Sequence, residues 1–339
     1  MKRSLILAAA ATLASSGAFA QSSMSLYGLI DMCYGRSIPD GAAEPKVKAD
    51  LHSGGDEGSG VCNSTTRFGL KGSADVGDGV KANFRLESGG ITSDGDVNPG
   101  GNFFNRQAWM GLSGSWGEFR IGRTDSIVFT TMIDFDFNGA SNGVSAGAYT
   151  GVGPFANSPG RFSRQIQYIS PSFGGITFKA GLRPKGNSEF GNKDAFAGSV
   201  AYADGPIAAA VAFQSKLDSA AKDFYSLAGS YDFGVAKVMA SYADGGKIGE
   251  GGTGKGYQLG VTAPVAGINI GAIYANNRDD AVKAKAWELF INKEIFKNVI
   301  AYAEAGNLKA TTTADDGEGG VITNNVKGNG YAVGLIYVF

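Results

Sequence analysis

The chain has 339 residues, with 30 basic and 31 acidic side chains, 53 glycines and nine prolines. Its formal net charge of −1 is too close to balance to indicate a nucleic-acid partner, and its one histidine, His52, nearly excludes His-activated nucleophiles and multi-histidine metal sites. So much glycine with so little proline indicates many tight turns rather than disorder.

Residues 1–20 have the pattern of a cleaved secretory signal peptide. Lys2 and Arg3 form a basic start, a short apolar core follows, and Ala18-Phe19-Ala20 matches an A-x-A cleavage site. The core is too short to span a bilayer as a helix, and no 20-residue apolar run follows it. We expect an exported mature chain, residues 21–339, with a formal charge of about −3.

The first mature segment, MSLYGLIDMC, alternates as a β-strand does. Met24, Leu26, Gly28, Ile30 and Met32 fall on one face, opposite Ser25, Tyr27, Leu29 and Asp31. Cys33 ends this segment, and Cys62 lies beyond a loop rich in Gly, Asp and Lys. An even cysteine count in an exported chain favours a disulfide between them, and two unrelated thiols are the alternative.

The same alternation recurs along the chain. TRFGLKG sets Phe68 and Leu70 against Arg67 and Lys71, and VKANFRLE sets its apolar residues against Lys81, Asn83, Arg85 and Glu87. RQIQYIS and the terminal YAVGLIYVF alternate as well. The sequence therefore predicts an all-β protein.

Residues 125–160 break this pattern. The segment has 36 residues, few charges, and two acids close together, Asp134 and Asp136. Because structureless loops beyond about 15 residues are uncommon without a function, we expect this one to fold into a tube formed by the strands and to narrow it.

Short turns alternate with longer polar loops, and the count gives 16 strands and eight long loops. The long loops are expected near 34–64, 92–102, 125–160, 184–193, 217–222, 244–255, 277–283 and 308–327. Even strand numbers, short turns at one end and long loops at the other are typical of outer-membrane β-barrels. Aromatic residues at strand ends favour a barrel over a soluble sandwich, namely Tyr27, Tyr202, Tyr231, Tyr242, Tyr274 and Phe339.

The order of these segments resembles the general diffusion porins of Gram-negative outer membranes. The motifs are SLYGLID, STTRFGLKGSADVGDGVKANFRLES, FNRQAWMGLSGSWGEFRIGR, RQIQYISPSFGGITF and YAVGLIYVF, and they extend over the whole mature chain. The resemblance implies a 16-stranded antiparallel barrel with short periplasmic turns, long external loops and the third loop folded into the lumen. It further implies a homotrimer in the outer membrane, in contact with its lipid and lipopolysaccharide.

The resemblance also assigns a role to the last residue, Phe339, as the signal to the barrel-assembly machinery. A membrane-interface aromatic is a second role that Phe339 can have at the same time. No cofactor, no metal and no nucleic-acid partner is expected.

A barrel of 16 strands leaves an aqueous channel, so the residues at its narrowest point set selectivity. Alternation turns Arg67, Arg85 and Arg161 inward, and Lys71 is a secondary candidate. Arg123 matches the family's constriction arginine, but strict alternation turns Arg120 inward instead. Both therefore stay candidates for the basic side.

The acidic side of the expected constriction comes from the third loop. The family places carboxylates there, and Asp134 and Asp136 are the candidates in this chain. Whether these acids face the arginines or the opposite wall is left open. Leu29 stands where some relatives carry an inward lysine, which makes the lumen less basic.

Two other motifs have weak support. Residues 249–255 resemble a phosphate-binding loop, but a glycine and a strand follow instead of Ser or Thr and a helix. Asp94, Asp96, Asp315 and Asp316 lack the spaced oxygens and closing Glu of a calcium loop.

We therefore expect a channel rather than an enzyme, in which small hydrophilic solutes and ions diffuse passively with a preference for anions. The alternative is a substrate-specific channel for small organic acids on the same scaffold.

Overall fold

The computed structural model describes residues 22–38, 48–56, 60–152, 160–186, 193–217, 222–246, 254–279, 282–315 and 321–339. The expected signal peptide, residues 1–20, lies outside this part of the chain, as do residues 247–253 of the glycine-rich loop and Asp316. Within the described ranges, no helix has the length and apolarity needed to cross a membrane.

Seventeen antiparallel strands make up almost all of the described chain. They are β1 (Ser23–Arg36), β2 (Asp50–Ser53), β3 (Arg67–Gly77), β4 (Val80–Gly89), β5 (Gln107–Gly114), β6 (Gly117–Asp125), β7 (Arg161–Ile169), β8 (Ile176–Arg183), β9 (Ala195–Asp204), β10 (Ile207–Gln214), β11 (Phe224–Asp232), β12 (Lys237–Asp244), β13 (Lys255–Val265), β14 (Ile268–Arg278), β15 (Val282–Phe296), β16 (Val299–Asp315) and β17 (Val321–Val338).

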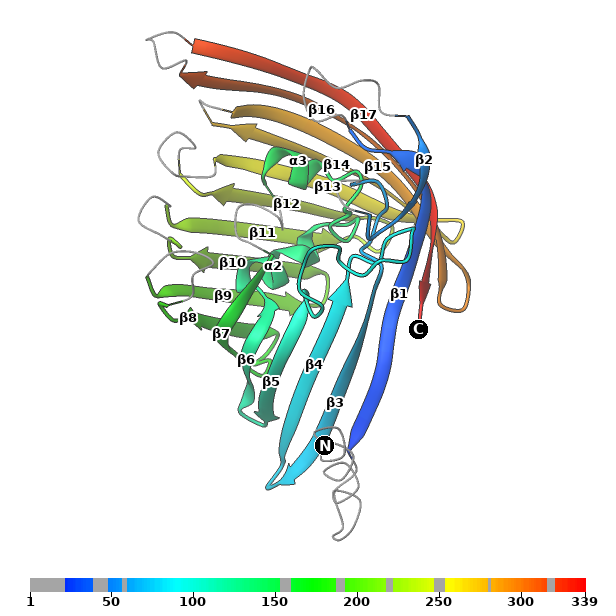
Figure 1. The fold of residues 1–339 in the computed structure, drawn as a ribbon. Helices are drawn as coiled ribbons and strands as arrows, with labels where there is room; N and C mark the ends of the chain where they lie inside the picture. The colour runs from blue at the N-terminus through cyan, green and yellow to red at the C-terminus, as the bar shows by residue number, and fades with distance from the viewer. Residues whose placement is uncertain are drawn as a thin grey trace.

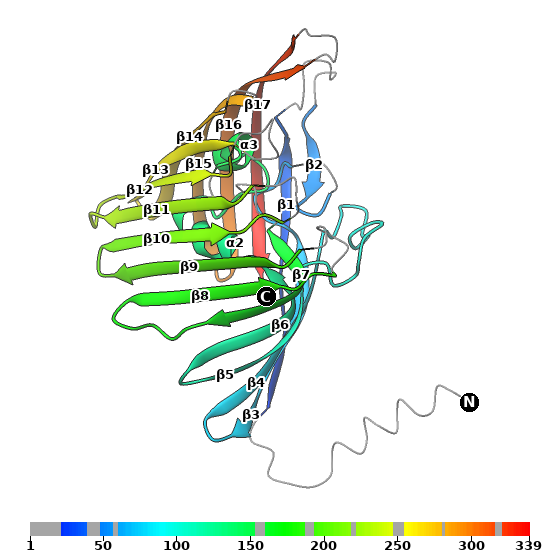
Figure 2. The same ribbon diagram turned by 90° about the vertical axis from the view of Figure 1, so that its left-hand side faces the viewer.

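Sixteen of these strands form a closed barrel, as predicted (Figures 1 and 2). From β3 onwards each strand pairs with the next, and β1 closes the ring because it pairs with β17 on one side and with β3 on the other. The sequence did not predict β2, a four-residue strand that pairs with the outer part of β1 inside the first long loop.

The ring is closed up to the last residue of the chain. The Phe339 amide donates to the Gly28 carbonyl oxygen at 3.0 Å, and the Gly28 amide donates back at 2.9 Å. A Cβ on Gly28 would lie 2.5 Å from the Arg67 carbonyl oxygen and 2.6 Å from the Phe339 ring, so this close approach requires glycine.

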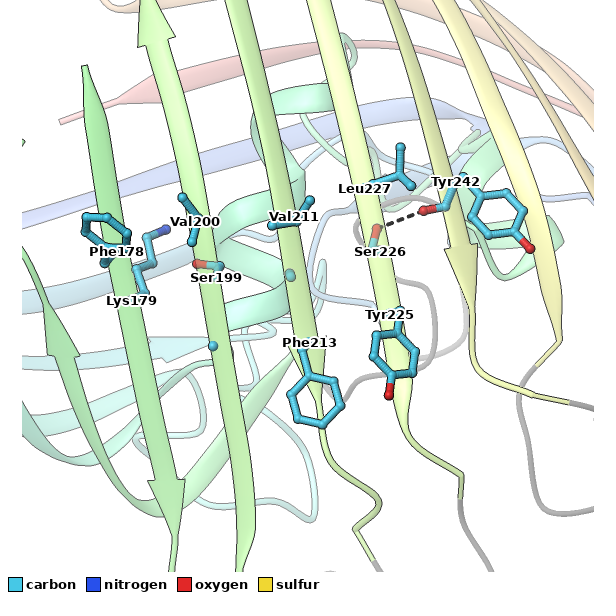
Figure 3. Close-up of a pocket in the computed structure, with 12 residues that line it drawn as sticks. Phe178, Lys179, Ser199, Val200, Val211, Phe213, Tyr225, Ser226, Leu227 and Tyr242 are labelled. Carbon is cyan, nitrogen blue, oxygen red and sulfur yellow. Dashed lines mark hydrogen bonds between the residues drawn. The ribbon is translucent and has the colours of Figure 1, made fainter. Parts of the chain in front are cut away.

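The outer face of the barrel is apolar, as the alternation predicts. In β1 the exposed large apolar residues are Met24, Leu26, Ile30, Met32 and Tyr34, while Leu29 and Asp31 are buried inside. Figure 3 shows the same arrangement across β8 to β12, where Phe178, Val200, Val211 and Leu227 are 40–54% exposed.

Two expectations for single elements were wrong. Tyr27 does not lie at the membrane interface, because its hydroxyl is turned inward and hydrogen-bonds to Glu87 and Arg85. The last long loop is shorter than 308–327, because β16 and β17 stay paired up to Asp315 and Val321.

Candidate functional site

The segment between β6 and β7 turns into the barrel and lies against its inner wall, as expected (Figure 1). It contains α2 (Ile127–Met132), the 3₁₀ helix η1 (Ile133–Phe135) and α3 (Ala146–Thr150), none of which the sequence predicted. Ser126 begins α2 as its N-cap, since its Oγ accepts a hydrogen bond from the Phe129 amide at 3.2 Å.

α2 docks on a wall of small side chains. Its buried residues Val128 and Met132, with Phe135 of η1, pack against the inner face of β9 to β12. That face consists mainly of alanines, which leave room for a helix inside the barrel, namely Ala201, Ala208, Ala210, Ala212, Ala228 and Ala243, with Phe224. The Thr131 hydroxyl adds a hydrogen bond to Ser199 Oγ at 2.9 Å.

The second half of the segment is held by two wall carboxylates. Glu304 of β16 accepts hydrogen bonds from Asn138 Nδ2 at 3.0 Å, Ser141 Oγ at 2.9 Å and the Val144 amide at 3.2 Å. Glu288 of β15 accepts from the amide of Ala146, the first residue of α3. These bonds fix the segment to the inner face of β15 and β16.

The orientation of Asp136, which the sequence left open, is away from the arginine side. Asp136 is 6% exposed, its Oδ1 accepts from the Asn138 amide at 3.1 Å, and it is turned toward the wall that carries Gln258 and Glu288. Burial raises the pKa of Asp136. The sequence could not predict the orientation of Asp136, because this orientation depends on how the helices of the loop dock on the wall.

Asp134 is exposed, two residues earlier in the loop. Its charge acts on Lys179 of β8, whose Nζ donates to the Thr130 carbonyl oxygen at 2.9 Å. Asp134 therefore faces the lumen, but near Lys179 rather than at the arginines.

Three of the four arginines predicted for the basic side line one cavity, which we call the arginine cavity. Arg67, Arg85 and Arg161 line it together with Arg106, which the sequence analysis did not select. The loop contributes Phe129, Ile133, Gly139, Ala140 and Asn142, and neither Asp134 nor Asp136 is among the lining residues. The described loop residues that line the cavity are thus uncharged.

The carboxylates of the cavity come from the wall. Glu87, 1% exposed, joins two arginines, with 2.6 Å from its Oε2 to Arg85 NH2 and 2.6 Å from its Oε1 to Arg106 Nε. The Nε of Arg161 lies 2.8 Å from Asp125 Oδ1. Arg67 instead donates to Ser64 Oγ at 3.1 Å and to the Thr65 carbonyl oxygen at 3.0 Å, and no described carboxylate forms a salt bridge with it.

A β-bulge explains why the sequence left both Arg123 and Arg120 as candidates for the constriction. The β6–β7 register shifts between Gly122 and Thr124, so strict alternation fails at Arg123. Arg123 donates to the Asn105 carbonyl oxygen at 2.6 Å and to Ser163 Oγ at 2.7 Å, and with Arg106 and Arg161 it lines a second cavity.

Arg120 and Lys71 lie outside both cavities. Arg120 pairs with Glu118 at 2.8 Å and stacks on Trp109, with 4.6 Å from its Cζ to the ring centroid. Lys71 Nζ lies 5.1 Å from the centroid of the Tyr27 ring. Both stay secondary candidates for the basic side.

A disulfide joins Cys33 of β1 to Cys62 in the first long loop. Val61 and Cys62 line the second cavity beside Arg106, Arg123 and Arg161. The bond therefore ties the first loop to the barrel next to the arginines.

Three residues that line the arginine cavity were not among the site residues predicted from the sequence, and the reasons differ. Glu87 could have been predicted from the alternation, because it lies two residues from Arg85 and therefore shares the same face of the strand. Arg106 stands just before β5, outside any periodic segment, and Asp125 is the last residue of β6. For those two the sequence carried no positional signal.

Comparisons with known proteins find close matches. A family model described as Gram-negative porin matches residues 7–313. An outer membrane porin protein of Bordetella pertussis is 31% identical over 325 residues, covering 87% of this chain and 82% of that protein. Outer membrane porin protein 32 of Delftia acidovorans is 31% identical over 341 residues, covering 91% and 90%.

Solved structures have the same fold. An anion-selective porin from Comamonas acidovorans superposes with a TM-score of 0.74 at 27% identity, covering 94% of this chain and 100% of that one. An outer membrane protein of Vibrio cholerae, in its trimer form, gives a TM-score of 0.65 at 14% identity over 94% and 99% of the two chains, which is a likeness of fold alone.

Proposed function

This chain belongs to the Gram-negative porin family, and from that premise we propose that its channel prefers anions and that the wall arginines set this preference. The protein is an outer-membrane β-barrel through which small hydrophilic solutes and ions diffuse passively. Its fold and family indicate a channel rather than an enzyme.

The observation that supports anion preference is the charge imbalance around the two cavities. Arg67, Arg85, Arg106, Arg123 and Arg161 line one or both of them, against the carboxylates Glu87, Asp125 and Asp56. A charge pair 4 Å apart is worth about 1 to 4 kcal/mol at dielectrics between those of water and a protein surface, which suffices for several-fold selectivity and still lets the ion leave.

Other residues shape the preference less strongly. Asp134 contributes a luminal negative charge near Lys179, while Arg120 and Lys71 extend the basic wall away from the arginine cavity. Leu29 adds no charge, since it packs with Cys33, Val61 and Tyr302. The Comamonas protein, named as anion-selective, supports the same preference at 27% identity.

The test is the reversal potential of purified protein in planar bilayers under a KCl gradient. We expect a potential of the sign that indicates chloride preference. Arg67→Glu and Arg161→Glu should reduce or reverse it, since each changes the cavity by two charges. Arg164→Glu is a control, because Arg164 is exposed and lies outside both cavities. Cation preference of the wild type would overturn the proposal.

We also propose a homotrimer, with conductance steps in multiples of three and a matching mass in native mass spectrometry. Phe339 serves as the signal to the barrel-assembly machinery, and its pairing with Gly28 supports a role of this residue in closing the ring.

A channel specific for small organic acids is the second candidate. Arg67 favours it, since a guanidinium with no carboxylate partner among the described residues suits bidentate binding of a substrate carboxylate. Saturable block of the chloride current by succinate would support specificity, whereas flux linear in succinate concentration would support general diffusion.

A further inference from the structure

A short segment of the first long loop, residues 61–66, lies between the barrel wall, the third loop and the arginines. These six residues form neither helix nor strand. Their buried backbone groups therefore take hydrogen-bond partners from neighbouring elements, and the position of the segment depends on those neighbours. We call residues 61–66 the clamp segment.

The clamp segment is fixed to the wall at two consecutive residues. Cys62 forms the disulfide with Cys33 of β1, and both cysteines are buried. The next residue, Asn63, donates from its amide to the Tyr302 hydroxyl oxygen at 3.0 Å. The same hydroxyl donates to Asp31 Oδ1 on β1 at 2.8 Å, so the covalent bond and the hydrogen bonds lead to the same part of the wall.

On one side the clamp segment holds the third loop. The Asn142 amide donates to the Asn63 carbonyl oxygen at 2.8 Å, and Asn63 Nδ2 donates to Asn138 Oδ1 at 3.1 Å. A Cβ on Gly143 would overlap the Val61 carbonyl oxygen, so the two backbones are in direct contact. These contacts reach the part of the third loop that follows η1, whereas α2 packs on β9 to β12.

On the other side the clamp segment holds Arg67. Its NH1 donates to Ser64 Oγ at 3.1 Å and to the Thr65 carbonyl oxygen at 3.0 Å, and both residues line the arginine cavity with it. The other three arginines of this cavity are paired with Glu87 or Asp125. Because no described carboxylate forms a salt bridge with Arg67, the position of its guanidinium depends on the clamp segment.

From these contacts we infer that the Cys33–Cys62 bond positions the constriction. It sets the separation between the third loop and Arg67, because one short segment holds both. A covalent bond restricts the conformations open to a segment without secondary structure, whereas hydrogen bonds beside an aqueous channel exchange with water at little net cost. Asn63 is the positioning residue that transmits this restriction to the third loop.

The inference goes beyond anion preference, and only its effect through Arg67 rests on the proposed function. The local order of the third loop can be measured without reference to any permeant ion. Cation preference of the wild type would therefore overturn the proposed function, and the exchange of loop amides would still decide on the clamp.

The test is the double variant Cys33→Ala, Cys62→Ala of the full-length protein in lipid vesicles. Hydrogen exchange of amides 138–144 should become about fivefold faster than in wild type, while amides 127–135 of α2 and η1 keep their rates. In planar bilayers the permeability ratio of chloride to potassium should fall by about twofold, because Arg67 is no longer held in the cavity.

A disulfide that only stabilises the barrel would lower the urea midpoint and leave exchange at 138–144 and selectivity unchanged. That result would overturn the inference. Equally faster exchange in both amide ranges would overturn it too, since it would indicate a general loss of stability.

A second variant, Asn63→Ala, keeps the disulfide and removes only the side-chain bonds to Asn138 and Glu304. Exchange of amides 138–144 should become about twofold faster. Asn83→Ala is the matched control, because Asn83 Nδ2 bonds to Ser113 Oγ at 2.8 Å and Asn83 lines neither cavity. Wild-type exchange rates in Asn63→Ala would contradict the clamp, even where the cysteine variant does not fold.

Discussion

At the scale of single residues, the arginine cavity depends on how each guanidinium is held. Glu87 accepts from Arg85, Arg106 and the Tyr27 hydroxyl while it is itself almost fully buried. A buried carboxylate that satisfies several charged donors fixes their positions strongly. Glu87 therefore orders two arginines and at the same time lowers the positive charge of the pore.

These two roles give the Glu87→Gln variant two opposite expected effects. Anion preference should rise in reversal-potential measurements, because Arg85 and Arg106 lose their counter-charge. Stability should fall by about 2 kcal/mol in urea unfolding from lipid vesicles, since hydrogen bonds to a charged group are lost.

Glu118→Gln is the matched control for Glu87→Gln. It removes a carboxylate two residues from its arginine, as in the Arg85–Glu87 pair, but Glu118 is more exposed than Glu87 and lines neither cavity. Little change is expected in stability. A Glu87→Gln channel with lower anion preference than wild type would contradict the assignment.

Asp136 predicts a pH dependence of loop docking. An aspartate in water has a pKa of about 3.9, and burial raises the pKa of Asp136, so the docked loop binds the proton more tightly than a solvated loop. Docking should be strongest below about pH 3.9 and should weaken as the pH rises through the pKa of the docked residue. Glu288 and Glu304 are the other titratable groups that face the loop from the wall.

The measurement is hydrogen exchange of amides 127–150, compared between wild type and Asp136→Asn at each pH. At pH 7 the variant should be several-fold better protected, and at pH 4 the difference should shrink. Asp134→Asn, an exposed acid two residues away, should show no such trend. Equal differences at both pH values would refute the role of Asp136.

At the scale of elements, the position of the constriction depends on the fit between α2 and the alanine wall. Six alanines under Val128, Met132 and Phe135 set how far the helix stands from β9 to β12. A larger wall residue must push the helix toward the arginines, because packed interiors accommodate extra volume poorly.

Ala212→Leu tests this contact. Ala212 is 5% exposed beneath the loop, so the variant should lose about 1–3 kcal/mol of stability and show a smaller single-channel conductance. Ala209→Leu on the same strand is exposed on the outer face and should change neither. Unchanged conductance in Ala212→Leu would show that α2 does not set the pore width.

Sequence periodicity predicted the elements well wherever strands are regular. The faces of β1, β3, β4 and β17 followed from alternation, because inner and outer faces of a barrel have different solvents. It failed at Arg123, where the β6–β7 register shifts because β7 has one extra residue. At Tyr27 alternation gave the correct inner face, and the expectation of a membrane-interface aromatic was wrong because the hydroxyl bonds to Arg85 and Glu87.

At the scale of the whole molecule, the sequence predicts the barrel. It predicts the interior of the pore only in part. Strand number and loop alternation are local signals, whereas the contact between loop and wall joins residues such as Asn138 and Glu304, which are 166 positions apart. The orientation of Asp136 follows from that long-range contact. The sequence therefore predicted which loop narrows the pore but not which of its faces meets the arginines.

The charge of the whole pore mouth predicts how selectivity depends on salt. The Debye length falls from about 10 Å at 0.1 M to about 3 Å at 1 M. The field of the arginines therefore extends through the arginine cavity at low salt and is screened within it only at high salt. Reversal potentials measured at a fixed tenfold KCl gradient should therefore indicate strong chloride preference when the dilute side is near 10 mM, and a weaker one near 300 mM. A preference independent of salt would instead mean that ions bind individual arginines directly, as in the substrate-specific alternative, and Arg67→Gln would then remove most of it.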